Sequence, residues 1–191
     1  IPIIYVLTQG PEEALSLLPD DRQGARDAVR HLVAQGRRRI AHVTGPANFH
    51  VVGERAAAYA DVLTEAGLAI PENGVLKGRW SEDWGHEAVA RWFEAGDPLP
   101  DGVFCGNDQI ARGVIDALRE RGVLVPRDVS VVGFDNWEIL AEQTRPPLTS
   151  VDMNLKELGR QAGLALLKRV NGDPAGQGTV KLPCTLRVRS S

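Results

Sequence analysis

VFCGNDQIARGVIDALRERG, residues 103–122, contains a complete strand–turn–helix unit. Val103–Cys105 is a short apolar run of strand-forming residues, and Gly106 interrupts it before a polar turn. Apolar residues then recur at the spacing of one helix face: Ala111, Val114, Ile115 and Leu118. Gly122 follows where a helix would end. The segment therefore predicts a buried strand and a helix that packs on it.

The same pattern recurs along the chain. Further buried strands are predicted at residues 40–44, 75–79, 129–134 and 148–151. The helices between them are predicted to stop at three more glycines: Gly36, Gly67 and Gly96. Such alternation predicts an α/β fold with a parallel sheet covered by helices. Residues 1–7 and 180–188 are predicted to be the first and last strands. Turn residues set these two runs apart, so the chain ends are expected to belong to a different lobe from the middle.

The composition is that of an ordinary globular protein, with 191 residues, 43% hydrophobic and 25% charged. A formal net charge of −3 gives this chain no general attraction for nucleic acid. Cys105 and Cys184 each lie in an apolar run and are predicted to be buried thiols. No signal peptide or membrane-length apolar run is visible. Because Ile1 opens directly on a predicted strand, we expect the chain to begin inside a longer protein.

Polar or aromatic residues follow four of the predicted strands or open the next helix: Arg55, Trp80, Asn107 and Asp135. In a parallel sheet these positions collect at the carboxyl edge, where ligands of open α/β sheets bind. Arginine donates, aspartate accepts and asparagine does both, so together they can bracket neighbouring hydroxyl groups. An indole face suits the carbon side of a sugar ring. The sequence therefore predicts a binding site for a polyol at this edge.

Each of these residues also has a purely structural interpretation. Asn107 or Asp108 could cap the helix that follows, and Asp135 could be a cap as well. Trp80 could fill the core, and Arg55 could be a solvated helix charge. Four such residues at equivalent strand ends favour the binding site.

Signals for catalysis are absent from the sequence. We find no nucleophile elbow, phosphate-binding loop or dinucleotide fingerprint, and the four histidines lack metal-ligand spacing. His50 lies in a loop near the predicted site and could hydrogen-bond a ligand, although such histidines are more often plain surface residues. We therefore expect no enzyme activity, no cofactor and no metal.

Several stretches resemble LacI-type transcriptional regulators, in the same order along the whole chain. Residues 31–41, HLVAQGRRRIA, resemble the family's H-L-x-x-x-G-H-R-R-I-A segment, and residues 106–111, GNDQIA, resemble its x-N-D-x-x-A element. Residues 125–135, VPRDVSVVGFD, are similar to its most diagnostic run, which residues 146–151, PPLTSV, continue. On the basis of these segments, the chain resembles the effector-binding core of the family.

The resemblance implies a periplasmic-binding-protein-like fold of two Rossmann-like lobes, with parallel sheets flanked by helices and an incomplete N-terminal lobe. Residues 1–19 would be a remnant of the DNA-proximal lobe, and residues 20–147 the distal, effector-binding lobe. Residues 148–174 would return to the proximal lobe, and residues 175–191 would supply the final strand of the distal lobe.

The resemblance also implies roles for individual residues. Arg55, Asn107 and Asp135 match effector-binding positions, and Trp80 matches a wall or ring-stacking position. Trp137 could lie in the effector cleft or in a dimer contact. Two departures predict a less polar wall on the proximal side: Leu7-Thr8-Gln9, where many members carry an acidic residue, and Met153, where many carry glutamine.

The partners implied are a saccharide-like effector and operator DNA, the latter through a helix-turn-helix headpiece outside this chain. The effector would favour one arrangement of the lobes of a cytoplasmic homodimer and so control DNA binding. A periplasmic sugar-binding protein of a transporter is the main alternative, because it shares the two-lobed architecture. An α/β enzyme is a weaker alternative, since no catalytic constellation is visible.

Overall fold

The computed structural model describes residues 1–96, 98–174 and 176–191. The chain forms two units and passes between them three times. The smaller unit comprises Ile1–Asp20 and Met153–Thr185, and the larger comprises Asp21–Asp152 and Leu186–Ser191. We describe each unit by itself.

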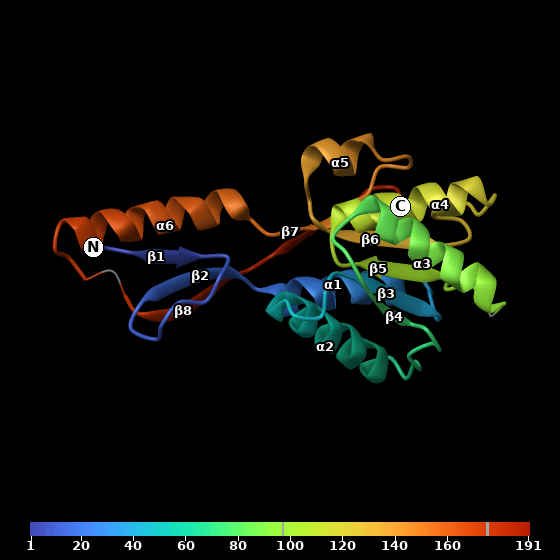
Figure 1. Cartoon of the computed structure of the whole chain (residues 1–191), viewed down its shortest axis with the longest axis horizontal. Coiled ribbons are helices and arrows are strands. Elements are labelled where there is room, and N and C mark those ends of the chain that lie inside the picture. The colour runs from blue at the N-terminus through green and yellow to red at the C-terminus, as the bar shows by residue number, and fades with distance from the viewer. Residues whose placement is uncertain (97, 175) are drawn as a thin grey trace. The chain divides into compact units, whose positions relative to one another are not determined.

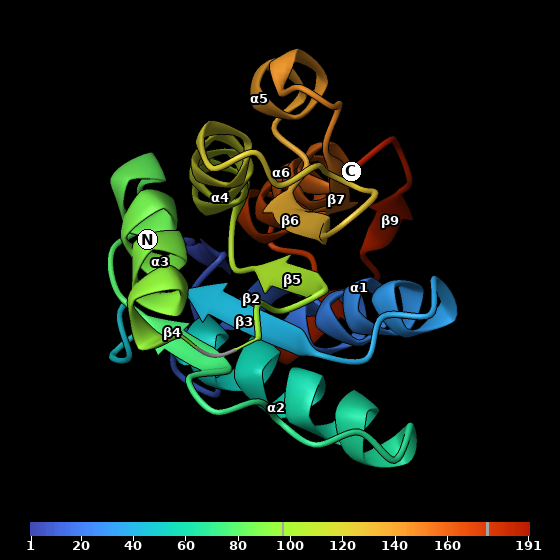
Figure 2. The ribbon, with the colours of Figure 1, turned by 90° about the vertical axis from the view of Figure 1, so that its right-hand side faces the viewer.

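The larger unit is built on a six-stranded sheet of order β4-β3-β5-β6-β7-β9. Its strands are β3 (Ile40–Thr44), β4 (Val75–Lys77), β5 (Gly102–Cys105), β6 (Ser130–Asp135), β7 (Thr149–Asp152) and β9 (Thr185–Arg187). The pairings from β4 to β7 are all parallel. Helices α1 (Asp21–Ala34) and α2 (His50–Glu65) cover one face, and α3 (Glu82–Ala95) and α4 (Asp108–Glu120) cover the other (Figure 2). The short helix α5 (Glu138–Gln143) contacts α4.

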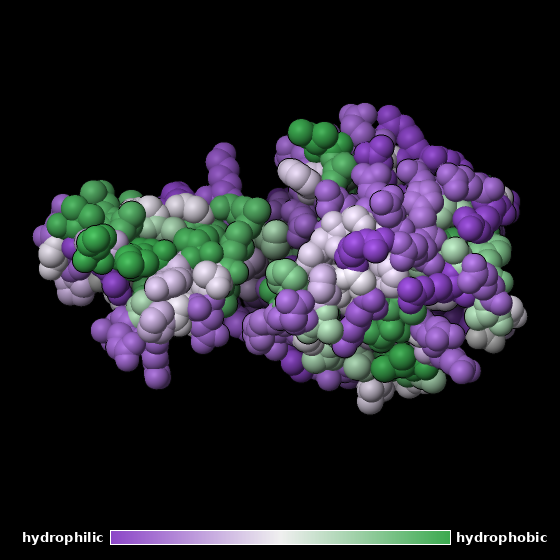
Figure 3. All heavy atoms as spheres, in the orientation of Figure 1, coloured by the Kyte–Doolittle hydropathy of each residue, from purple (hydrophilic) through white to green (hydrophobic). Residues whose placement is uncertain are grey.

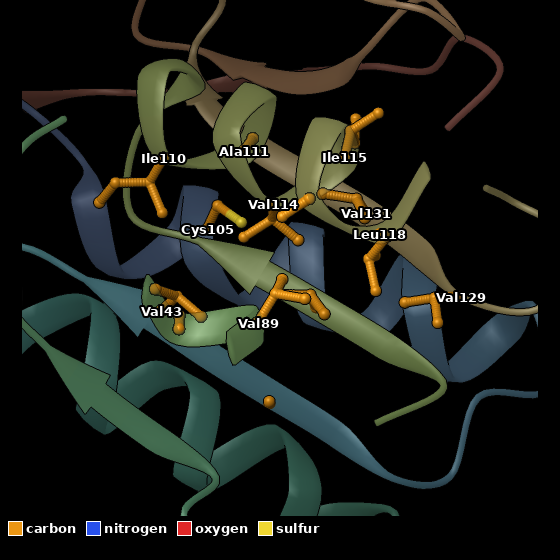
Figure 4. Close-up of a cluster of buried hydrophobic side chains, with 14 of the residues drawn as sticks. Val43, Val89, Cys105, Ile110, Ala111, Val114, Ile115, Leu118, Val129 and Val131 are labelled. Atoms are coloured by element: carbon orange, nitrogen blue, oxygen red, sulfur yellow. The ribbon is translucent and has the colours of Figure 1, made fainter. Parts of the chain in front are cut away.

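The core on the α3–α4 face consists mainly of aliphatic side chains. Figure 4 shows Val43, Cys105 and Val131 from three neighbouring strands, packed against Val114 and Leu118 of α4. All five are essentially inaccessible to water. Because every second strand residue points to this face, the β-branched runs seen in the sequence bury half of their side chains here. This packing holds the strand ends, and the residues that follow them, in fixed positions.

The four predicted helix stops are confirmed. Gly36, Gly67, Gly96 and Gly122 all have positive φ angles, between 66° and 85°. Gly96 is the left-handed cap of α3. This backbone conformation is open to glycine at little cost, so each glycine ends its helix and turns the chain toward the next strand. Neither cysteine is in a disulfide, and both are buried thiols, as predicted.

The smaller unit contains a three-stranded sheet and one long helix. Strands β1 (Ile4–Val6), β2 (Leu15–Pro19) and β8 (Gly178–Leu182) are paired in parallel in the order β1-β2-β8. Helix α6 (Leu155–Val170) lies along this sheet (Figure 1). Its buried residue Leu158 packs against Leu15, Leu17 and Leu182 of the sheet. Leu164, Leu167 and Val170 of α6 are at least half exposed. Figure 3 accordingly shows apolar residues gathered over this unit.

Three features differ from the sequence predictions. The apolar run at residues 180–188 is not one strand: β8 belongs to the small sheet and β9 to the large one, because Pro183 cannot donate to a strand ladder and ends β8. The strand β2 was not predicted. The unit boundaries lie at 20/21, 152/153 and 185/186, and not after residues 19, 147 and 174, since β7 pairs with β6 and β8 pairs with β2.

In the part of the chain that the structure describes, no helix has the length and apolar character needed to cross a membrane.

Candidate functional site

The sheet of the larger unit has a reversal in strand order between β3 and β5. The chain runs from β3 to β4 on one side and then returns to β5 on the other side of β3. Connections on opposite faces leave an opening beyond the carboxyl ends of the strands at such a point. The residues that follow these strands therefore form the candidate site.

Arg55 occupies the centre of this edge. It is 5% exposed, on the first turns of α2. Its Nε and Nη2 donate to Oδ1 of Asp21 at 2.8 and 2.5 Å, and its Nη1 donates to the backbone oxygen of Gly106 at 2.5 Å. Its Cζ lies 3.6 Å from the centroid of the Phe134 ring. Arg55 is therefore not a solvated helix charge; it ties α1, α2, β5 and β6 together.

Asp21 is the residue that sequence reasoning missed. It is the first residue of α1, only 9% exposed, and it compensates the Arg55 charge. In the sequence it is one of two adjacent aspartates before a helix, which is an ordinary helix-start signal. No spacing pattern connects it with an arginine 34 residues away.

The Trp80 ring packs closely against two glycines, Gly45 and Gly106, at the carboxyl edge of the sheet. A Cβ on Gly45 would collide with the indole ring, and a Cβ on Gly106 would lie 3.0 Å from its Cζ3. Phe49, the residue before α2, meets the ring edge-on, with 6.1 Å between centroids. Trp80 packs against the α3–α4 core but is only partly buried. Its side chain therefore fills space in the core and also remains partly accessible to solvent. An aromatic wall therefore stands at the end of β4.

Asn107 caps α4, as the structural interpretation anticipated. Its Oδ1 accepts from the backbone nitrogen of Ile110 at 2.9 Å, and the residue is 8% exposed. Since the cap uses the acceptor oxygen, the chemistry that Asn107 can offer a ligand is donation from Nδ2.

Asp135 ends β6 in an unusual conformation. Its φ is 105°, a value that side-chain-bearing residues rarely adopt, and it is not a helix cap. Its carboxylate has no hydrogen bond within the described part of the chain. Burial raises the pKa of Asp135 to about 7; the charge of Arg55 opposes this rise, and Asp108 and Asp21 add to it. Asp135 thus has a partly buried carboxyl group whose pKa lies close to neutral pH.

Asp108 holds the segment that carries Asp135. One of its oxygens accepts from Ser150 Oγ at 2.5 Å, and the other accepts from the backbone nitrogen of Trp137 at 2.6 Å. Ser150 Oγ also accepts from the backbone nitrogen of Asn136 at 3.0 Å. Burial raises the pKa of Asp108 to about 6, against the opposing effect of these hydrogen bonds. Asp108, 1% exposed, is therefore a supporting residue beneath the site.

The other two predicted residues are peripheral. His50 is exposed at the first turn of α2, next to Phe49. The Trp137 side chain is 59% exposed at the start of α5, while its backbone is held by Asp108. Four of the six predicted residues, Arg55, Trp80, Asn107 and Asp135, thus follow or adjoin neighbouring strand ends at the carboxyl edge.

Comparison with known proteins identifies the class of this chain. The model of the periplasmic binding protein-like domain family matches residues 29–191. The HTH-type transcriptional repressor CytR of Escherichia coli (strain K12) is 32% identical over 191 residues, which are 100% of this chain and 55% of CytR. The first curated relatives are matched over 55% to 58% of their length, so the chain spans little more than half of them.

Solved structures agree with this match. The sugar-binding transcriptional regulator (LacI family) from Escherichia coli, complexed with phosphate, superposes with a TM-score of 0.89 at 32% identity, over 100% of this chain and 68% of that one. The transcriptional regulator CelR in complex with cellobiose gives a TM-score of 0.88 at 31% identity, over 98% of this chain and 58% of CelR. The fold is therefore the predicted periplasmic-binding-protein-like α/β fold with parallel sheets flanked by helices.

The chain belongs to the LacI family of transcriptional regulators and is their effector-binding core. This confirms the family predicted from the sequence. The family is one of regulators and not of enzymes, as also predicted. The matched proteins are named as transcription regulators, which favours this assignment over the transporter alternative.

Proposed function

We propose that the carboxyl edge of the six-stranded sheet binds a small, saccharide-like effector through Trp80, Asn107 and Asp135, with Arg55 organising the edge. The observation that carries the proposal is Asp135, a partly buried carboxylate without a hydrogen bond in the described part of the chain. Partial burial without an internal partner disfavours the charge of this carboxylate, and a ligand hydroxyl that donates to it would lower that cost. The hydrogen bonds within the described residues give the Asp135 carboxylate no structural role.

The remaining groups complement a polyol. The Asn107 amide can donate to a hydroxyl oxygen, while the Trp80 face can cover the carbon side of a ring. Arg55 holds the backbone of Gly106 and the ring of Phe134 in place, and so organises the edge. His50 and Trp137 would contribute at the rim. The sugar-binding and cellobiose-bound relatives support this class of ligand.

The effector would act on DNA through other parts of the whole protein. CytR is named an HTH-type repressor, which supports a helix-turn-helix headpiece as the partner that contacts operator DNA. The larger unit would be the distal lobe, and the smaller unit part of the DNA-proximal lobe. The exposed Ile139 of α5 is a candidate for the contact with a second copy in a homodimer. The whole regulator would work in the cytoplasm, without a cofactor.

The experiment is a screen of neutral mono- and disaccharides by tryptophan fluorescence, followed by calorimetry on each hit. Asp135→Ala should weaken binding of a hit by at least tenfold, because a hydrogen bond to a charged group contributes about 1.5–3 kcal/mol. Glu94→Ala, which removes an exposed carboxylate of α3, is the matched control and should not change the affinity. Equal affinities for wild type and Asp135→Ala would remove Asp135 from the site.

A further inference from the structure

Arg55, the arginine at the centre of the site, already has partners for its donors. Arg55 directs Nε and Nη2 to Asp21 and Nη1 to the Gly106 carbonyl. Its flat face is covered by Phe134 at 3.6 Å. A guanidinium bound in this way from several sides cannot offer the two-pronged grip by which arginine captures phosphate or carboxylate. The arginine at this edge therefore has a structural partner in place of an anionic ligand.

We propose that Asp21 determines the charge specificity of the effector site. By holding Arg55, it leaves the Asp135 carboxylate as the charge that an effector meets, so that the site accepts neutral or cationic, hydroxyl- or amine-bearing ligands and rejects anionic ones. The proposal rests on the proposed function of this edge, because it concerns the ligand of the same site.

The electrostatics of Asp135 support this exclusion. Burial and the carboxylates of Asp108 and Asp21 raise its pKa, and Arg55 compensates only partly. An environment that already disfavours the charge of its own carboxylate disfavours a phosphate group even more, because the anion would be desolvated beside the same neighbours.

The basic residues near the end of β4 do not make the site favourable for an anion. Arg79 forms an ion pair with Glu87 of α3. Lys77 is exposed on the edge strand, where water and salt screen its charge. Neither is buried with Asp135 and Arg55, so neither can offset the desolvation of an anion there.

The test uses inorganic phosphate as the probe and the indole N–H signal of Trp80 in a ¹H–¹⁵N spectrum as the readout, assigned with Trp80→Phe. At constant ionic strength, wild type should show no saturable shift up to about 10 mM phosphate, a range in which weak specific sites fill. Asp21→Ala removes the acceptor of Arg55 Nε and Nη2, and should bind phosphate at least tenfold more tightly. Asp61→Asn, in an exposed ion pair of α2 with Arg22, is the control and should behave as wild type.

Saturable binding of phosphate by wild type at Trp80 would overturn the proposal, and so would a folded Asp21→Ala protein without any gain. If Asp21→Ala does not fold, Asp135→Asn provides the second arm. It removes the carboxylate without disturbing the Arg55–Asp21 pair, and it should raise phosphate affinity several-fold; an unchanged affinity would contradict the proposal. A sugar screen without hits would contradict the saccharide function and leave the phosphate result standing, so the two failures are distinguishable.

Discussion

Replacing Arg55 by methionine removes one partner of a buried ion pair and leaves the other uncompensated. Arg55 and Asp21 are 5% and 9% exposed, and their closest atoms are 2.5 Å apart. Breaking a buried pair on one side costs about 3–5 kcal/mol, whereas exposed pairs contribute about 0–1 kcal/mol. We therefore expect Arg55→Met to lower the free energy of unfolding of the larger unit by about 3–5 kcal/mol. Arg30→Met, which breaks an exposed pair with Glu65, should lower it by less than about 1 kcal/mol.

Urea unfolding followed by tryptophan fluorescence measures this loss. All four tryptophans lie between Asp21 and Asp152, so the signal reports the larger unit alone. Adding Asp21→Asn to Arg55→Met removes the stranded carboxylate and should recover part of the stability. A loss below about 1 kcal/mol for Arg55→Met, or full additivity in the double variant, would refute the assignment of a buried, coupled pair.

Three further outcomes are expected. Gly45→Ala should displace the Trp80 ring and shift its fluorescence, whereas Gly53→Ala, with open space inside α2, should stabilise by about 0.5–1 kcal/mol in thermal unfolding. The Asp135 contribution to stability is complete below its ordinary pKa of 3.8 and is lost as the pH rises through about 7. Asp135→Asn, which cannot ionise, should therefore stabilise more at pH 8 than at pH 5, by on the order of 2 kcal/mol in urea titrations; equal gains would contradict the raised pKa. Asp108→Ala should cost about 2–4 kcal/mol and speed hydrogen exchange at the Trp137 amide, and unchanged exchange would contradict its supporting role.

Much of the larger unit could be predicted from the sequence because its signals are local. Apolar runs, helical stripes and glycine stops each occupy a few consecutive residues, and parallel pairing then brings the strand ends to one edge. That is why Trp80, Asn107 and Asp135 could be assigned to one edge of the sheet without a structure. Pro183 shows the limit: it lies inside an apolar run, and the pattern did not reveal that the chain changes sheets there.

The partners of the site residues could not be predicted. The pairing of Arg55 with Asp21 depends on how α1 and α2 pack over the sheet, and so does the burial of Arg55. The support that Asp108 gives to Trp137 depends on the left-handed turn at Asp135 and Asn136. Such contacts join residues far apart in sequence, and no periodicity marks them. The structure thereby turns Arg55 from a predicted ligand donor into the charge-compensated centre of the edge.

The central claim is that this edge is the effector site, and calorimetry of a saccharide hit on wild type and on the Asp135→Ala and Trp80→Ala variants tests it most directly. We predict saturable binding by wild type and a loss of at least about tenfold in each variant, in keeping with one charged hydrogen bond and one ring contact. Both variants should remain folded by circular dichroism. Undiminished affinity in both folded variants would contradict the claim and place the effector elsewhere.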